Sequence, residues 1–105
     1  GGGMVFTAGQ VAWDETGNVT AIGDIRGQTV QTLKNVIAVL QEAGASLDDV
    51  LKCNVYLKDM NDFQIMNDEF AKVFPVDPPA RTTVQTPMAE PEMLVEIEAV
   101  AYIGS

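Results

Sequence analysis

The chain has 105 residues, 47% of them hydrophobic, and a formal net charge of −9 from six basic and 15 acidic side chains. This length suits one domain, and the hydrophobic content excludes a disordered chain. The absence of histidine and the single cysteine, Cys53, exclude a zinc site, an internal disulfide and most hydrolytic sites. No apolar run reaches the roughly 18 residues of a membrane span, so we expect a soluble, cytoplasmic protein. The acidic charge argues against binding to nucleic acid.

The first half of the chain predicts one long helix after one or two short strands. Residues 4–11 have the apolar character of a buried strand, and residues 19–22 that of a second short strand or an extended loop. Asp24 is a suitable N-cap, apolar side chains recur at helical spacing after it, and Gly44 is a suitable stop. We therefore predict a helix over residues 25–43.

The second half predicts a strand, a helix and two further strands. Residues 51–57 alternate between apolar and polar side chains, which is the period of a half-buried strand. A helix over residues 63–74 ends at Pro75. Residues 81–86 and 93–103 are the last two strands. This order predicts an α+β fold in which two helices cover one face of a mostly antiparallel or mixed sheet.

Both faces of the last predicted strand are rich in apolar residues. One face carries Val95, Ile97, Ala99, Ala101 and Ile103, and the other carries Leu94, Glu96, Glu98, Val100 and Tyr102. Two helices cover only one face of a sheet, so the other face needs a different cover. We therefore expect a homo-oligomer, with the carboxylates and Arg81 near the seam between subunits.

Arg81 lies in a segment that otherwise has the composition of an interior strand. A charge in such a place needs a carboxylate partner or an anionic ligand. The planar guanidinium suits a bidentate grip on a carboxylate better than an ammonium does. The alternative is a structural ion pair with Glu96 or Glu98. Spacing alone leaves both interpretations open.

Five segments, in uninterrupted order from Val5 to the end, match one family. They are residues 6–10 (FTAGQ), 44–50 (GASLDDV), 55–63 (VYLKDMNDF), 79–84 (PARTTV) and 95–99 (VEIEA). The chain resembles the RidA (YjgF) family of reactive-intermediate deaminases. The resemblance implies a single domain over residues 1–105, a chorismate-mutase-like α+β fold, and a homotrimer with sites in the clefts between subunits. It also implies hydrolysis of 2-imino acids and their enamine tautomers, such as 2-aminoacrylate, to 2-oxo acids and ammonia without a cofactor.

The resemblance assigns roles to particular residues. Arg81 matches the arginine that grips the substrate carboxylate, and Glu96 matches the acid beside the attacking water. Without the family, Glu98 is an equally good acid, because it shares the face of Glu96. Asn67 falls at a position that often lines the cleft.

Three smaller residues complete the predicted substrate-binding set. Gly9 allows a close approach of the main chain or a bulge. Thr83 shares the side of Arg81, and its backbone groups suit the imine nitrogen or the tetrahedral intermediate, with the hydroxyl a bystander. Ala8 stands where the family often has serine, and Thr83 where it often has cysteine. The family's usual N-terminal strand, with its tyrosine, has no counterpart in these 105 residues, so it is either trimmed from this chain or absent from the protein.

Three functions follow as hypotheses. The first is an enzyme, the imine deaminase. The second is a trimeric module that binds small carboxylic acids without turnover. The third, an endoribonuclease, is disfavoured by the absence of histidine and the net charge of −9. We expect 2-imino and 2-oxo acids as ligands, no metal, and neither nucleic acid nor membrane as a partner.

Overall fold

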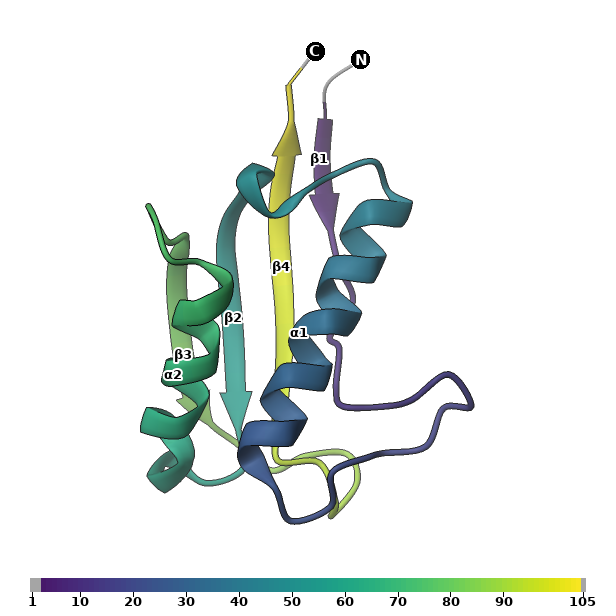
Figure 1. Ribbon diagram of the computed structural model, residues 1–105, viewed down its shortest axis with the longest axis vertical. Helices are drawn as coiled ribbons and strands as arrows, with labels where there is room; N and C mark the ends of the chain where they lie inside the picture. The colour runs from purple at the N-terminus through teal and green to yellow at the C-terminus, as the bar shows by residue number, and fades with distance from the viewer. Residues whose placement is uncertain (1–2, 105) are drawn as a thin grey trace.

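Two helices pack on one face of a four-stranded sheet in the computed structural model, which describes residues 3–104 (Figure 1). The elements in chain order are β1 (Gly3–Phe6), α1 (Ile25–Glu42), β2 (Val50–Leu57), α2 (Phe63–Val73), β3 (Ala80–Gln85) and β4 (Val95–Ile103). Short 3₁₀ turns precede β2 (Leu47–Asp49) and α2 (Met60–Asp62). The predicted α+β fold with both helices on one face is confirmed.

The sheet is mixed, with the strand order β1-β4-β2-β3. β4 is antiparallel to both of its neighbours, β1 and β2, whereas β2 and β3 are parallel. A parallel pair needs a crossover connection, and α2 provides it between β2 and β3. This crossover places α2 over the β2–β3 side of the sheet, while α1 lies over the β4 side (Figure 1).

Local sequence signals account for α1. The Asp24 side chain accepts a hydrogen bond from the Gly27 amide at 3.0 Å and caps the first turn. Gly44 adopts the left-handed conformation, with φ of 83°, just beyond the last turn. The helix ends at Glu42, one residue before the predicted end. Its buried apolar stripe consists of Leu33, Val36 and Leu40.

The core lies between the helices and the sheet. Fully buried side chains come from alternate positions of the two central strands and from the facing stripes of the helices. They include Cys53, Val55, Leu57, Val95, Ile97, Ala99 and Ala101 of the strands, and Leu40 and Met66 of the helices. The predicted division of the last strand into two faces is therefore confirmed.

Of the two alternatives for residues 19–22, the structure has the extended loop, because Val19 makes only an isolated bridge to Trp13. Two expectations about other strands are wrong. Leu51, expected on the buried side, is 53% exposed. The register of β2 against β4 shifts between Val50 and Lys52, and this irregularity turns Leu51 out of the core. The first strand is also shorter than predicted, since β1 ends at Phe6.

The face of the sheet turned away from the helices carries a mixture of apolar and polar side chains. We call it the open face, and it comprises Met4, Phe6, Lys52, Asn54, Tyr56, Thr82, Val84, Glu96, Glu98, Val100 and Tyr102. Phe6 is 71% exposed and Tyr102 is 49% exposed, so large apolar side chains on this face stand in solvent in a single copy. Exposure of this kind marks a surface that suits burial against another molecule.

Candidate functional site

Arg81 lies on the helix side of β3, at the edge of the sheet. It is opposite Cys53 in the parallel register, and the Cys53 side chain belongs to the core. The guanidinium carbon is 4.7 Å from the ring centroid of Phe70 and 5.4 Å from that of Phe63, both on α2. The faces of aromatic rings attract a cation at these distances. Partial burial lowers the pKa of Arg81, although an arginine remains protonated at neutral pH.

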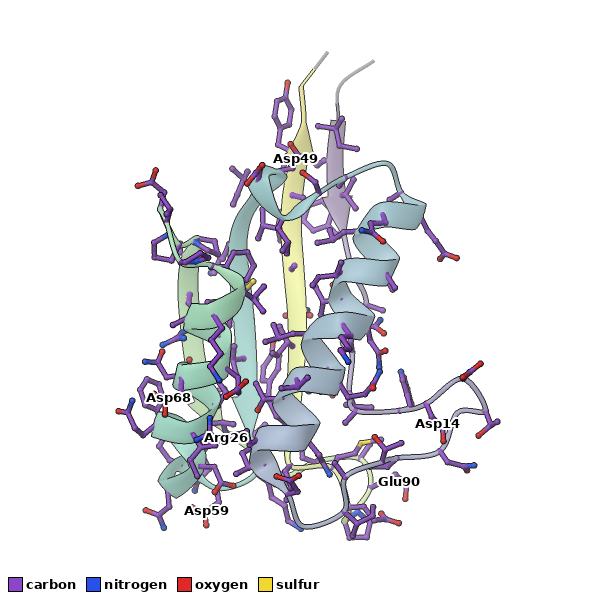
Figure 2. The ribbon with its side chains drawn as sticks, in the orientation of Figure 1. Asp14, Arg26, Asp49, Asp59, Asp68 and Glu90 are labelled. Carbon is purple, nitrogen blue, oxygen red and sulfur yellow. The ribbon has the colours of Figure 1, made fainter. Side chains whose placement is uncertain are left out.

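Arg81 has no carboxylate partner within residues 3–104. Arg26 instead pairs with Glu69 and with Asp68, the latter at 3.7 Å, and Lys72 pairs with Glu69 at 2.9 Å. These ion pairs lie where α1 meets α2, as the labelled Arg26 and Asp68 show in Figure 2. The structural ion pair between Arg81 and Glu96 or Glu98, left open by spacing, is therefore absent from a single copy. A partly buried cation without a partner is suited to hold an anion.

A pocket of about 300 Å³ opens beside Arg81. Asn67 of α2 lines the same pocket, so the structure brings together two of the predicted site residues. The remaining wall is apolar and consists of Phe70, Ala71, Phe74, Pro78 and Pro79. This volume is at the lower end of the range for small-molecule sites. The pocket therefore combines one cation, one amide and an apolar wall.

The two carboxylates of β4 differ in their surroundings on the open face. Oε1 of Glu98 accepts hydrogen bonds from the Tyr56 hydroxyl at 2.6 Å and from the Asn54 amide at 3.0 Å. These bonds, led by that from Tyr56, lower the pKa of Glu98. The side chain of Glu96 makes no hydrogen bond or ion pair with the described residues. Of the two acids that the sequence could not separate, Glu96 is the one whose carboxylate remains available.

A bulge lies beside Glu96, where the chain leaves β1. Pairing with β4 runs as far as Phe6 and resumes at a bridge between Gln10 and Ile97, with the register shifted by one residue. Within the bulge, the Thr7 hydroxyl accepts a hydrogen bond from the Ala99 amide at 2.9 Å. The Gly9 main chain then lies against the Glu96 carboxylate. The predicted role of Gly9, a bulge or a close approach, corresponds to this geometry.

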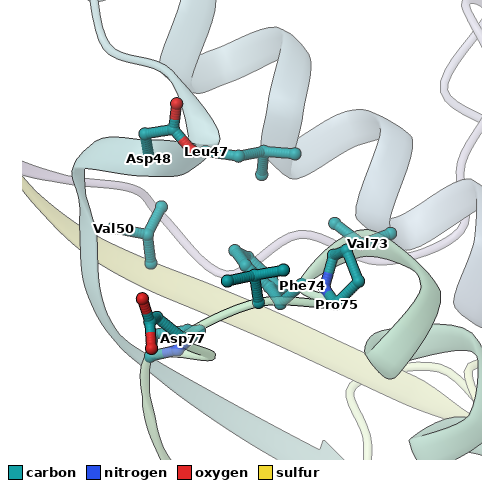
Figure 3. Close-up of a pocket in the computed structure, with 9 residues that line it drawn as sticks. Leu47, Asp48, Val50, Val73, Phe74, Pro75 and Asp77 are labelled. Carbon is teal, nitrogen blue, oxygen red and sulfur yellow. The ribbon is translucent and has the colours of Figure 1, made fainter.

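A second hollow, of about 350 Å³, lies beyond the C-terminal end of α2 (Figure 3). Leu47, Val50, Val73 and Phe74 form its apolar part, and the Asp48 and Asp77 carboxylates also line it. None of the predicted site residues belongs to it. Within residues 3–104, no group of three or more acidic or cysteine side chains is arranged to hold a metal ion. None of the helices in this part of the chain is long and apolar enough to cross a membrane.

The family described as "Endoribonuclease L-PSP" matches residues 1–103. The chain belongs to this family. A RutC family protein of Pyrococcus horikoshii is 48% identical over 102 residues, which are 96% of this chain and 80% of the relative. The crystal structure of RidA from the Antarctic bacterium Psychrobacter superposes with a TM-score of 0.87 at 36% identity and covers 95% of this chain and 80% of its own. TdcF of Escherichia coli, crystallised with bound serine, gives a TM-score of 0.87 at 34% identity over 96% and 81% of the two chains.

These comparisons confirm the resemblance to the RidA (YjgF) family and the L-PSP fold. In this L-PSP chain the predicted site residues form two groups. Arg81, Asn67 and Thr83 lie on the helix side of the β2–β3 end, where the buried Thr83 hydroxyl has no partner among the described residues. Glu96 lies on the open face of β4.

Gly9 and the exposed Ala8 lie in the bulge beside Glu96, so they complete the second group. The two groups do not meet within one copy. Sequence reasoning missed Phe63 and Phe70 as contacts of Arg81. The sequence predicted only that both belong to a helix over residues 63–74, and the crossover that lays this helix over β3 cannot be seen in the sequence.

Proposed function

We propose that the chain is a cofactor-independent deaminase that hydrolyses 2-imino acids and their enamine tautomers, such as 2-aminoacrylate, to 2-oxo acids and ammonia. The observation that carries the proposal is the guanidinium of Arg81, which has no carboxylate partner within residues 3–104 and lies over the rings of Phe63 and Phe70 at the wall of a pocket. In a chain with a net charge of −9, a local cation is what can capture a small anionic substrate. A carboxylate is the anion whose geometry matches a guanidinium fork. The serine bound to TdcF is a small ligand of this kind.

The position of Glu96 supports a site completed by a second copy of the chain. Glu96 is on the open face, whereas Arg81 is on the helix face of the same sheet. A small substrate held by Arg81 cannot reach the Glu96 carboxylate of the same copy through the sheet. β3, which carries Arg81, is an edge strand of the sheet. A neighbouring copy that packs its open face against this edge would bring its own Glu96 to the pocket. We therefore place the activity in a homotrimer with its sites between subunits.

In this proposal Glu96 acts on water. Its carboxylate takes a proton from a water molecule as the oxygen forms a bond to C2 of the imine, and the π electrons of the C=N bond move to nitrogen. Glu96 returns this proton to the nitrogen, which gives the carbinolamine. Glu96 then takes the proton of the carbinolamine hydroxyl and passes it to the amine, and the C–N bond breaks to release ammonia as the C=O of the 2-oxo acid forms. An enamine enters the same sequence after it tautomerises to the imine. The backbone of Thr83, two residues beyond Arg81, would steady the imine nitrogen.

A carboxylate-binding module without turnover is the second candidate. The serine bound to TdcF favours it, because a stable complex needs only the grip of Arg81 and not the chemistry of Glu96. The endoribonuclease activity in the family description is a poor match to this chain, which has no histidine and only six basic residues against 15 acidic ones.

The two candidates differ in one experiment. A serine dehydratase generates 2-aminoacrylate continuously from serine, and the release of pyruvate and ammonia is followed with and without the protein. Faster release that is lost in Glu96→Gln supports the deaminase. Binding of serine or a 2-oxo acid by calorimetry, without any acceleration, supports the binding module instead. Degradation of RNA by the wild-type protein, without either effect, would contradict both.

A further inference from the structure

The side chain of Glu96 occupies the space that a side chain at Gly9 would need. A methyl group in place of the Gly9 hydrogen would lie 2.8 Å from Cδ and 3.2 Å from Cγ of Glu96, and still closer to Oε2. The backbone conformation does not require glycine there. Within residues 3–104, the left-handed glycines are Gly17, Gly23 and Gly44. Gly9 is therefore needed for space and not for its torsion angles.

The main chain on both sides of Gly9 is fixed to β4. Thr7 exchanges hydrogen bonds with Ala99, from its amide to the Ala99 oxygen at 3.0 Å and from the Ala99 amide to its hydroxyl at 2.9 Å. Gln10 exchanges both backbone hydrogen bonds with Ile97, at 2.8 and 2.9 Å. A side chain added at Gly9 would therefore move the flexible end of Glu96 more easily than the main chain.

We infer that Gly9 is a positioning residue for Glu96, because the missing side chain leaves the niche in which the carboxylate lies. Glu96 makes no hydrogen bond or ion pair with residues 3–104, so packing against the bulge is what sets its orientation. The effect of this orientation on catalysis rests on the proposed function. The niche itself is a property of the structure and can be tested without turnover.

The substitution Gly9→Ala tests the inference, with Gly3→Ala as the matched control. Gly3 is in β1, the strand that leads into the bulge, and a methyl group there meets nothing within 4 Å. We expect Gly9→Ala to lower kcat for imine hydrolysis by a factor on the order of ten to a hundred, because a displaced acid no longer aligns the water. KM should change little, since Arg81 lies on the other face. Gly3→Ala should match the wild type in both constants.

A double-mutant cycle with Glu96→Asp separates positioning from a direct contact of Gly9 with substrate. The aspartate is one methylene shorter, and its carboxyl carbon takes about the position of Cγ of Glu96, which lies farther from the added methyl group (3.2 Å) than Cδ does (2.8 Å). The crowding by the methyl group is therefore smaller in the Glu96→Asp background. Gly9→Ala should then cost much less in the Glu96→Asp background than in the wild type. An equal loss in both backgrounds would overturn the inference, because Gly9 would then act independently of Glu96.

A crystal structure of Gly9→Ala supplies the readout that does not depend on activity. We expect the Glu96 carboxylate to leave the niche while residues 7–10 stay in place, with a melting temperature close to that of the wild type. A Glu96 side chain that keeps its position beside a shifted main chain would overturn the inference. If the wild type shows no imine hydrolysis, the proposed function fails, and this structure still decides whether Gly9 positions Glu96.

Discussion

The hydroxyl of Tyr56 donates a hydrogen bond to Oε1 of Glu98 at 2.6 Å, from β2 across to β4. This bond raises the pKa of Tyr56 and is the largest cause of the lowered pKa of Glu98. Glu98 is thus a satisfied acceptor on the open face, while Glu96, two residues before it, makes no hydrogen bond or ion pair within residues 3–104. The two acids are equivalent in the strand pattern, and only the cross-strand partners distinguish them.

The first prediction concerns Tyr56→Phe and its dependence on pH. Loss of the hydroxyl should cost about 1 kcal/mol in the free energy of unfolding at neutral pH, because the bond is charge-assisted but partly exposed. The lowered pKa of Glu98 means that this stabilisation is complete above the ordinary value of 4.5 and is lost as the pH falls through the lowered value. Urea unfolding of the wild type and of Tyr56→Phe, at pH 7 and near pH 3, measures how much of this stabilisation remains at each pH. A difference that stays constant between these pH values would contradict the assigned role of Glu98.

Local signals explain which parts of the fold could be predicted. The helix α1 follows from an apolar period, a capping Asp24 and a terminating Gly44, all of which act within one turn of the helix end. The alternation on β4 predicted two faces correctly, because side chains on any strand point to opposite sides. Where a residue's environment depends on its own neighbours in sequence, the prediction was correct.

Long-range pairing explains what could not be predicted. Leu51 is exposed because the register of β2 shifts against β4, and no residue nearby signals that shift. Within the described residues Arg81 has no carboxylate partner, because α2 crosses over β3 and brings Phe70 rather than a carboxylate to the guanidinium. The sequence identified Arg81 and Glu96 as candidate site residues, but it could not show that they lie on opposite faces of one sheet.

The second prediction concerns Cys53, whose side chain is 1% exposed. Burial raises the pKa of its thiol to about 11, so the thiol stays protonated at pH 8 and is both inaccessible and unreactive. A chromogenic thiol reagent should therefore react slowly with the native protein and completely in denaturant, and pretreatment should leave imine hydrolysis intact. Rapid stoichiometric modification of the native protein would show that the β2–β3 region opens readily.

The third prediction concerns assembly through the open face. Phe6 is exposed in a single copy, so Phe6→Glu should leave the fold of the protomer intact while it weakens a trimer buried on that face. Burial of one such side chain contributes roughly 1.5–3 kcal/mol. Light scattering should give the mass of three chains for the wild type and a smaller mass for the variant at micromolar concentration.

Ile22→Glu is the matched control for assembly. Ile22 is 63% exposed but lies in the loop before α1, away from the open face. This variant should remain trimeric. A wild-type protein with the mass of one chain at micromolar concentration would contradict both the trimer and a site shared between copies. Assembly that is unaffected by Phe6→Glu would place the interface elsewhere.

The last prediction compares the two arginines of the chain. Arg81→Lys keeps the charge but loses the planar fork that matches a carboxylate. We expect kcat/KM for imino acids to fall on the order of a hundredfold, because a lost charge-assisted hydrogen bond costs ~2–3 kcal/mol. Arg26→Lys is the matched control, because Arg26 already pairs with Glu69 and Asp68 at the contact of α1 with α2. Arg26→Lys should cost some stability and leave kcat/KM unchanged.

Melting temperatures and initial rates of both variants decide whether Arg81 holds the substrate. If Arg81→Lys is fully active, the carboxylate is held elsewhere. If Arg81→Lys melts far below Arg26→Lys, Arg81 serves the packing of Phe63 and Phe70 over β3 and not the substrate.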